Sequence, residues 1–301
     1  MSDTASKPPK ASKFPLRLNQ LAAAPKLPKG APIARKPAQV LSAHLVATPS
    51  ASIAAARAVL RPQALLQHSV DHALSAKSPS GLGLDSADVR VRMVERLRGE
   101  GIQHPSVLNA MLRVQRHRFV DSALVIQAYE DTSLPIGHGQ TISKPSVVAR
   151  MIELLMGGAQ ARATLHLGKV LEIGTGCGYQ AAVLACVAKH VVSVERVKAL
   201  HDKARALLVD ERAVSVRLVY GDGMRGHAPN APYDSIIAAA GGEALPEDWL
   251  AQLAVGGRLV APVAVGSSRQ ALVVVDRTVQ GFERHVFETV QFVPLKSGMV
   301  R

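Results

Sequence analysis

Aromatic residues and cysteines are scarce in this chain of 301 residues. Phe, Trp and Tyr make up only 3% of it, and of these residues only Phe14 lies in the first eighty positions. The two cysteines, Cys177 and Cys186, provide neither a disulfide framework nor the spacing of a metal site. We therefore expect no bound metal, and a reducing, cytoplasmic compartment is the simplest fit.

Long hydrophobic runs are also missing. The best candidate for a membrane span, residues 40–56, is uncharged but contains Pro49 and several Ser and Thr residues. It falls short of the ~20 strongly apolar residues that a spanning helix needs. The first ten residues, MSDTASKPPK, are polar throughout, whereas a secretory signal has an apolar centre. We expect neither a membrane span nor a secretory signal.

Positive charge and proline are concentrated in the first eighty residues. This segment holds eleven Lys or Arg residues against Asp3 and Asp71, and therefore carries +9 of the net charge of +13. It also holds ten of the eighteen prolines. Ordering a backbone costs roughly 1–2 kcal/mol per residue, and the segment has few large apolar groups to offset this cost. We predict a basic, Pro/Ala-rich, mostly disordered extension over residues 1–84 and a folded domain over residues 85–301.

Several roles are open for this extension. It has the Arg, Ser and Ala content of a transit peptide, but its prolines would break the amphipathic helix that such a peptide forms. Its charge suits an acidic membrane surface or a nucleic acid, although it lacks aromatic residues that stack on bases. The simplest alternative is a solvated, dispensable segment.

The rest of the chain has the pattern of an α/β fold. Helical spacing of apolar residues predicts helices within 85–102, 104–114 and 145–156, the last with Pro145 in its first turn and Ser143 or Lys144 near the cap. From Lys169 onward short apolar strands alternate with helices, which predicts βαβ units on a mostly parallel sheet with helices on both faces. After Gly266 three strands, 270–276, 282–288 and 289–295, predict an antiparallel edge.

A glycine loop, VLEIGTGCGYQ, follows the first of these strands and opens a helix. Its glycines permit a tight turn and close approach of a ligand to backbone N–H groups. Glu195 ends the next strand, where an acid can accept hydrogen bonds from ribose hydroxyls, and Asp222 stands in a similar turn, YGDGM. The dinucleotide fingerprint G-x-G-x-x-G does not fit, because the third glycine comes one position early.

The E-x-G-x-G-x-G loop instead resembles the cofactor loop of S-adenosylmethionine-dependent methyltransferases. This resemblance implies their Rossmann-like fold and S-adenosyl-L-methionine as the cofactor. It assigns residues 168–301 to the cofactor-binding sheet and places Asp222 near the adenine. The cofactor-binding residues that it implies in this part of the chain are Glu172, Gly174, Gly176, Gly178, Glu195, Asp222 and Gly223.

Four segments, in order, resemble one methyltransferase family more specifically. They are RHRFVD at 116–121, AYEDTSLPIG at 128–137, QTISKP at 140–145 and EIGTGCGYQ at 172–180. Over residues 86–295 the chain is similar to the protein-L-isoaspartate O-methyltransferases. The resemblance implies methylation of the α-carboxylate of L-isoaspartyl residues in damaged proteins and peptides. The methyl ester then closes to a succinimide, which starts their repair.

The same resemblance assigns roles within residues 85–160, which would supply N-terminal helices and a substrate loop. Ser143 matches the catalytic serine of the family. Gln140, Thr141 and Ile142 match the loop that closes over the cofactor, and Thr141, Ile142 and Ser143 would bind substrate. A carboxylate with a pKa near 4 is already ionised at neutral pH, so it needs no general base. An uncharged loop suits such a nucleophile, and we expect Ser143 to orient it; a plain helix cap is the alternative role.

Two departures from the family pattern concern the substrate side. Gly241-Gly242 stand where the family often has a proline-bearing turn, and the contacts of Lys296 and the residues after it are not fixed by the pattern. Two other functions are also open: an RNA methyltransferase of the same fold anchored by the basic extension, and a non-catalytic module that binds the cofactor. We expect isoaspartyl proteins and peptides as partners and a monomeric protein.

Overall fold

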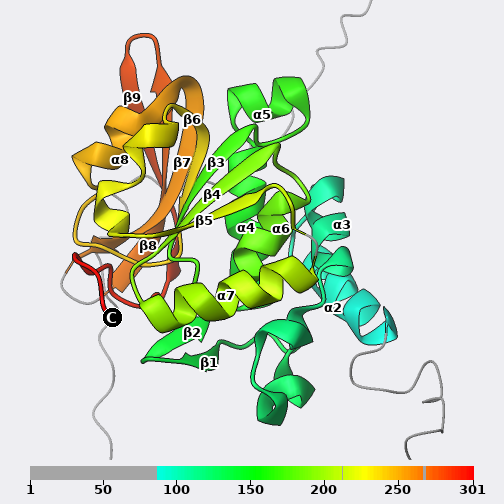
Figure 1. The fold of residues 1–301 in the computed structure, drawn as a ribbon. Helices are drawn as coiled ribbons and strands as arrows, with labels where there is room; N and C mark the ends of the chain where they lie inside the picture. Colours follow the sequence, from blue (N-terminus) through cyan, green and yellow to red (C-terminus); the bar gives the residue numbers. More distant parts are fainter. Residues whose placement is uncertain (1–86, 212, 267–268) are drawn as a thin grey trace, which may run out of the picture. The chain divides into compact units, whose positions relative to one another are not determined.

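The computed structural model describes residues 87–211, 213–266 and 269–301. The predicted extension over residues 1–84 lies outside these described residues. Figure 1 shows that the described part is built around one twisted sheet with helices packed against it. The sheet has seven strands, and a separate two-stranded hairpin lies apart from it.

Two helices open the described part, as the sequence predicted: α2 (Ala87–Gly99) and α3 (Pro105–Arg113). Each turns an apolar face inward, with Met93 and Leu97 buried from α2 and Val107 and Met111 from α3. Two short 3-10 helices, η2 (Arg116–Phe119) and η3 (Ser122–Gln127), follow. This region leads the chain to the hairpin.

The stretch predicted as a loop before Ser143 is partly a hairpin. Strands β1 (Leu134–Gly137) and β2 (Gln140–Ile142) pair antiparallel. His138 and Gly139 between them have φ angles of 54° and 67°. Positive φ at both positions is the geometry of a tight two-residue turn, and glycine adopts it without strain. The hairpin delivers Ser143 directly to helix α4 (Pro145–Met156), which is followed by a short helix, α5 (Ala159–Thr164), that the sequence analysis did not predict.

The main sheet has the strand order β5-β4-β3-β6-β7-β8-β9. Neighbouring strands from β5 to β7 are parallel, and β8 and β9 are antiparallel additions, so the predicted mixed sheet is confirmed. The strands are β3 (Lys169–Ile173), β4 (His190–Glu195), β5 (Val216–Tyr220), β6 (Tyr233–Ala238), β7 (Leu253–Val265), β8 (Arg269–Thr278) and β9 (Gly281–Val290). The helices between them are α6 (Tyr179–Ala185), α7 (Lys198–Asp210) and α8 (Glu247–Gln252).

The prediction of three strands after Gly266 was wrong. Thr289 and Val290 complete β9, and residues 291–295 belong to no named strand. The backbone N–H of Phe292 donates to the side chain of Gln270 (2.8 Å) instead of to a neighbouring strand. Pro294 forms an isolated bridge with Gly241. The segment therefore crosses toward the loop after β6 and does not extend the sheet.

Two hydrophobic cores cover the two faces of the sheet, because successive side chains of a strand point to opposite faces. In β3, Val170 belongs to the larger core, which includes buried residues of α2, α3, α4 and α6. Leu171 and Ile173 belong to the second core, together with Trp249 of α8. Helices therefore pack against both faces, as predicted.

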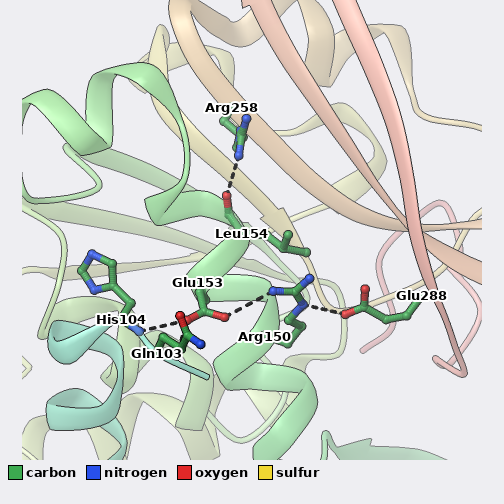
Figure 2. A network of polar contacts seen from close by, with 7 residues as sticks. All are labelled: Gln103, His104, Arg150, Glu153, Leu154, Arg258 and Glu288. Carbon is green, nitrogen blue, oxygen red and sulfur yellow. Dashed lines mark hydrogen bonds and ion pairs between the residues drawn. The ribbon is translucent and has the colours of Figure 1, made fainter. Parts of the chain in front are cut away.

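Helix α4 is tied to its surroundings along its second half (Figure 2). One carboxylate oxygen of Glu153 accepts the backbone N–H groups of Gln103 (2.6 Å) and His104 (2.9 Å) before α3. Arg150 contacts the other oxygen of Glu153 (3.3 Å) and reaches Glu288 of β9 (2.8 Å). Arg258 of β7 donates to the carbonyl of Leu154 (2.9 Å). These contacts fix the end of α4 that lies away from Ser143.

Candidate active site

The glycine loop lies at the carboxyl end of β3. Gly174, Gly176 and Gly178 all have positive φ angles, which favour glycine. A Cβ on Gly178 would lie 3.2 Å from Leu208 of α7, and a Cβ on Gly176 would lie 3.1 Å from Ile136 of the hairpin. Gly178 therefore serves the packing of α6 on α7, whereas Gly176 faces the hairpin before Ser143.

Glu195 connects the loop to the end of the neighbouring strand β4. Its side chain is buried, and one carboxylate oxygen accepts the N–H of Gly176 at 2.9 Å. The other oxygen accepts the N–H of Val197 at 2.8 Å. A carboxylate oxygen can accept more than one hydrogen bond, so Glu195 keeps acceptor capacity at the place where the sequence predicted a ribose contact.

A buried chain of polar groups lies beneath the glycine loop. Ser193 donates to Glu172 (2.5 Å), and the hydroxyls of Ser193 and Thr175 are also 2.5 Å apart. Burial raises the pKa of Glu172 to about 8. Its second oxygen and both amide atoms of Gln180 have no hydrogen-bond partner within the described residues. Sequence reasoning named Glu172 but missed Ser193 and Thr175, because their hydroxyls matter only through contacts across strands.

Asp222 contacts the end of the chain. One carboxylate oxygen accepts the N–H of Met224 (2.9 Å), and the other accepts the N–H of Gly298 (2.7 Å). Arg196 donates to the carbonyls of Ser297 (3.0 Å) and Gly298 (2.8 Å). Val300 then pairs with Val197 as a parallel bridge. We call residues 296–301 the C-terminal strap, since they lie across the ends of β4 and β5.

A narrow cavity of about 90 Å³ lies between the glycine loop, the residues before α4 and the segment that leads into the strap. Glu172, Gly178 and Asp222 are not among the described residues that line it. Lys296, whose contacts the sequence left open, does line it, as do Gln180, Thr175 and Cys177. The predicted cofactor residues that line it are Gln140, Thr141, Ile142, Gly174, Gly176, Glu195 and Gly223.

A wider groove of about 1510 Å³ lies beside this cavity. Its walls come from the residues around Ser143, from β8 and β9, and from residues 289–293. Thr141, Ser143, Ala239 and Val293 line both the cavity and the groove. The side-chain hydroxyls on this shared wall are those of Thr141 and Ser143.

Ser143 does not cap α4. The cap residue is Lys144, which makes no side-chain cap bond, and the N–H of Ser146 is accepted by Asp131 at 2.9 Å. Within the described residues the Ser143 hydroxyl makes no hydrogen bond, and the side chain is half-buried. The alternative prediction, that Ser143 is a plain helix cap, is therefore wrong.

Gly241, the first of the two glycines at 241–242, fits the space left by a glutamine. Gly241 pairs with the segment after β9 through its N–H to Val293 (2.9 Å) and its carbonyl to Leu295 (2.8 Å). A Cβ on Gly241 would lie 2.3 Å from the amide nitrogen of Gln270. Glycine therefore lets Gln270 reach both this loop and the N–H of Phe292 along the floor of the groove.

The part of the chain that the structure describes contains neither a candidate membrane span nor a cluster of metal ligands. No helix there has the length and apolar character needed to cross a membrane. Nor do three or more His, Cys, Asp or Glu side chains there gather in a way that could hold a metal ion. Cys177 and Cys186 are both unpaired, and burial raises the pKa of each thiol.

Comparison with known proteins agrees with this architecture. A family model described as protein-L-isoaspartate(D-aspartate) O-methyltransferase matches residues 89–300. A protein-L-isoaspartate O-methyltransferase of Leptothrix cholodnii is 63% identical over 224 residues, which cover 73% of this chain and 77% of the relative. One of Methylibium petroleiphilum is 55% identical over 266 residues, 88% of this chain and 98% of the relative, so its match extends into the basic extension.

A solved structure shares the fold. It is a Plasmodium falciparum protein described as a protein-L-isoaspartate O-methyltransferase in complex with S-adenosyl-L-homocysteine, and it superposes with a TM-score of 0.60 at 23% identity. The superposition covers 69% of this chain and 98% of that chain. The family model spans most of the described residues, and the relatives match over most of their length. The chain therefore belongs to the protein-L-isoaspartate(D-aspartate) O-methyltransferase family.

Proposed function

We propose that this protein transfers a methyl group from S-adenosyl-L-methionine to the α-carboxylate of L-isoaspartyl residues in damaged proteins and peptides. One observation carries the proposal: Thr141 and Ser143 stand on the wall that the narrow cavity shares with the wide groove. A methyl donor in the cavity and a peptide in the groove would meet at this wall. The family of the chain supports the same pairing of donor and acceptor.

The residues around the cavity fit S-adenosyl-L-methionine chemically. Glu195 offers acceptor capacity for ribose hydroxyls at the end of β4, and the glycine loop brings backbone close to the ligand. Gln180, whose amide atoms have no hydrogen-bond partner among the described residues, also lines the cavity. We propose Gln140, Thr141, Ile142, Gly174, Gly176, Glu195 and Gly223 as direct cofactor contacts, with Glu172 and Gly178 supporting the loop.

Asp222, which the sequence also indicates as a cofactor residue, is not among the described residues that line the cavity. Its carboxylate is bound by the N–H of Gly298, while the next residue, Gly223, lines the cavity. Ligand pockets are usually roughly 300–1,000 Å³, larger than the cavity of about 90 Å³ seen here. We propose that the strap beside Asp222 moves outward when the cofactor enters. Asp222 would approach the adenine once the strap beside it moves.

When bound, the cofactor supplies an electrophilic methyl group on sulfur, which a carboxylate oxygen takes as an ester while the sulfur keeps the bonding electron pair. The protein then has little proton chemistry to perform, because the carboxylate arrives ionised. Its residues can act by aligning the carboxylate and by excluding water from the shared wall. We propose that the Ser143 hydroxyl donates a hydrogen bond to the carboxylate oxygen that does not react, and that Thr141 and Ile142 complete the contact.

The first experiment measures methyl transfer from labelled S-adenosyl-L-methionine to two peptides that differ only in an isoaspartyl or a normal aspartyl linkage. We expect base-labile label on the isoaspartyl peptide alone, and at least tenfold less label with Ser143→Ala. Binding of S-adenosyl-L-homocysteine, measured by calorimetry, controls for loss of the cofactor site in the variant. Label on neither peptide, with the cofactor still bound, would overturn the proposed function.

Family membership does not favour the two alternatives, an RNA methyltransferase and a non-catalytic module. A monomeric state and a cytoplasmic location remain our predictions, as does the boundary between the extension and the domain. Nucleic-acid contact by the basic extension is a separate prediction, and the salt dependence of RNA binding would test it.

A further inference from the structure

Asp131 holds the first turn of helix α4, although it lies fifteen residues before the position that it contacts. One of its carboxylate oxygens accepts the backbone N–H of Ser146 at 2.9 Å. The other accepts the hydroxyl of the same residue at 2.7 Å. Ser146 is the second residue of α4 and stands three positions after Ser143. Asp131 therefore performs the capping that neither Ser143 nor Lys144 performs.

The segment that carries Asp131 is itself held by a buried arginine. Arg116 is fully buried, and it donates to the carbonyls of Ala128 (2.7 Å) and Thr132 (3.4 Å) on either side of Asp131. Its guanidinium also lies over the ring of Tyr179, with 4.8 Å between its central carbon and the ring centre. Tyr179 follows the glycine loop and lines the narrow cavity. A continuous set of contacts thus runs from the cofactor loop through Arg116 and Asp131 to α4.

The other end of α4 has its own supports, through Glu153, Arg150 and Arg258 (Figure 2). Within the described residues, the first turn of α4 is hydrogen-bonded to one side chain from elsewhere in the chain, that of Asp131. The position of that turn sets the position of Ser143 on the shared wall, because only Lys144 lies between Ser143 and the helix.

We propose that Asp131 is a positioning residue for the methyl transfer, acting through Ser146 to place Ser143 between the cofactor cavity and the groove. This inference rests on the proposed function, in which the Ser143 hydroxyl orients the substrate carboxylate. Asp131 is not among the described residues that line either the cavity or the groove, and both of its oxygens are engaged by Ser146. It therefore acts through Ser146 and does not touch the substrate.

The protein offers a matched control for this role. Asp121 also caps a short helix, since its carboxylate accepts the N–H of Ala123 at 3.0 Å at the start of η3. Within the described residues, its side chain makes no hydrogen bond or ion pair with α4. Asp121→Ala thus removes the same kind of cap from a neighbouring element and leaves the first turn of α4 unchanged.

The test compares the full chain with Asp131→Ala, Asp131→Asn, Ser146→Ala and Asp121→Ala. For Asp131→Ala we expect kcat/KM for the isoaspartyl peptide to fall at least tenfold, because small misplacements of an orienting group cost up to about a hundredfold. The dissociation constant of S-adenosyl-L-homocysteine should stay within about threefold of the wild type. Asp131→Asn keeps an acceptor for the Ser146 N–H and should restore most of the activity.

Ser146→Ala removes only the hydroxyl contact, so its loss should be smaller than that of Asp131→Ala. Asp121→Ala should stay within twofold of the wild type. Hydrogen exchange should become faster at the amides of Ser146 to Val148 in Asp131→Ala and not in Asp121→Ala. This readout follows the first turn of α4 whether or not the peptide is methylated, and it also shows whether the variant is folded.

An active wild type with an equally active Asp131→Ala would overturn the positioning role while leaving the proposed function in place. So would an equal loss of activity in Asp121→Ala, or a parallel loss of cofactor affinity in Asp131→Ala. An inactive wild type would overturn the proposed function and the positioning role together, and faster exchange at Ser146 would then show that the cap is structural alone.

Discussion

At the candidate site, folding changes the protonation of the Glu172 carboxyl group more than that of any other described carboxyl group. It is fully buried between the glycine loop and Ser193, and burial raises its pKa from 4.5 to about 8. The folded protein therefore keeps a proton on Glu172 at a pH where the unfolded chain has released it. Between pH 4.5 and pH 8 the folded state binds more protons, so the free energy of unfolding falls as pH rises through this window.

Replacing Glu172 with glutamine should remove this dependence, because glutamine resembles the protonated acid. We expect the melting temperature of the wild type to fall relative to Glu172→Gln as the pH rises from 5 to 8. A domain of this size shifts by roughly 2–4 °C for each kcal/mol, so thermal unfolding at several pH values can measure the difference. Glu283→Gln, which changes an exposed carboxylate on β9, is the control. Parallel pH profiles for the wild type and Glu172→Gln would contradict the prediction.

The positions of single site residues were predictable from sequence where the residue belongs to a short motif at the end of a strand. Glu195 and the glycines at 174 and 176 follow strand ends, and their positions agree with the sequence analysis. Arg116 and Asp131 lie within recognised segments, but nothing local indicates that one is buried or that the other caps a helix fifteen residues away. Arginine is rarely buried, so its burial here was not predictable from residue type.

Among the elements, the C-terminal strap is held mainly by hydrogen bonds, with side-chain contacts from Arg196, Asp222 and Tyr220. Arg196 binds the carbonyls of Ser297 and Gly298, and its own carbonyl accepts the N–H of Val300 (2.8 Å). The strap contributes little apolar burial, since Met299 and Val300 are exposed. Segments with few buried apolar contacts open at low free energy, so polar contacts control their exchange.

We expect Arg196→Ala to increase hydrogen exchange in residues 296–301 by at least tenfold, because two hydrogen bonds to the strap are lost. Exchange in β3 and β4 should not change. Mass spectrometry of the protein without and with S-adenosyl-L-homocysteine measures both regions. Arg217→Ala, on the exposed side of β5, is the matched control. Unchanged exchange of the strap in Arg196→Ala would contradict the prediction and show that the contact with Asp222 and the backbone bridge at Val300 are enough to hold it.

Helices and strands with a clear periodic spacing of apolar residues were predicted well. Segments whose conformation is fixed by contacts with residues far away in the sequence were not. The strands from β3 to β8 and helices α2 to α4 follow the spacing of apolar residues. Residues 291–295 have the composition of a strand, but their partners are Gln270 and Gly241 across the groove. The hairpin before Ser143 was not predicted because its strands are only four and three residues long, too short to show a periodic pattern, and its turn depends on His138 and Gly139.

On the scale of the whole molecule, the described residues contain both cores and both cavities. Among the described residues, the larger core runs from Met93 to Val274 and the second core from Leu171 to Val275. Because the family model matches residues 89–300, we predict that a chain lacking residues 1–84 folds and keeps the cofactor affinity and kcat/KM of the full chain within about twofold. Peptide methylation and calorimetry on the two proteins measure this. An insoluble product, or a loss of activity above tenfold, would show that the extension contributes to the domain.

Because the cavity and the groove share few residues, most groove residues can be substituted without changing the lining of the cavity. Among the described residues, only Thr141, Ser143, Ala239 and Val293 face both spaces, and the other described groove residues, such as Arg269 and Gln270, do not line the narrow cavity. We therefore predict that changes along β8 and β9 alter which peptides are accepted without altering how the methyl donor is held. A library of groove variants that spares these four positions is a natural starting point for redirecting the enzyme to new carboxylates.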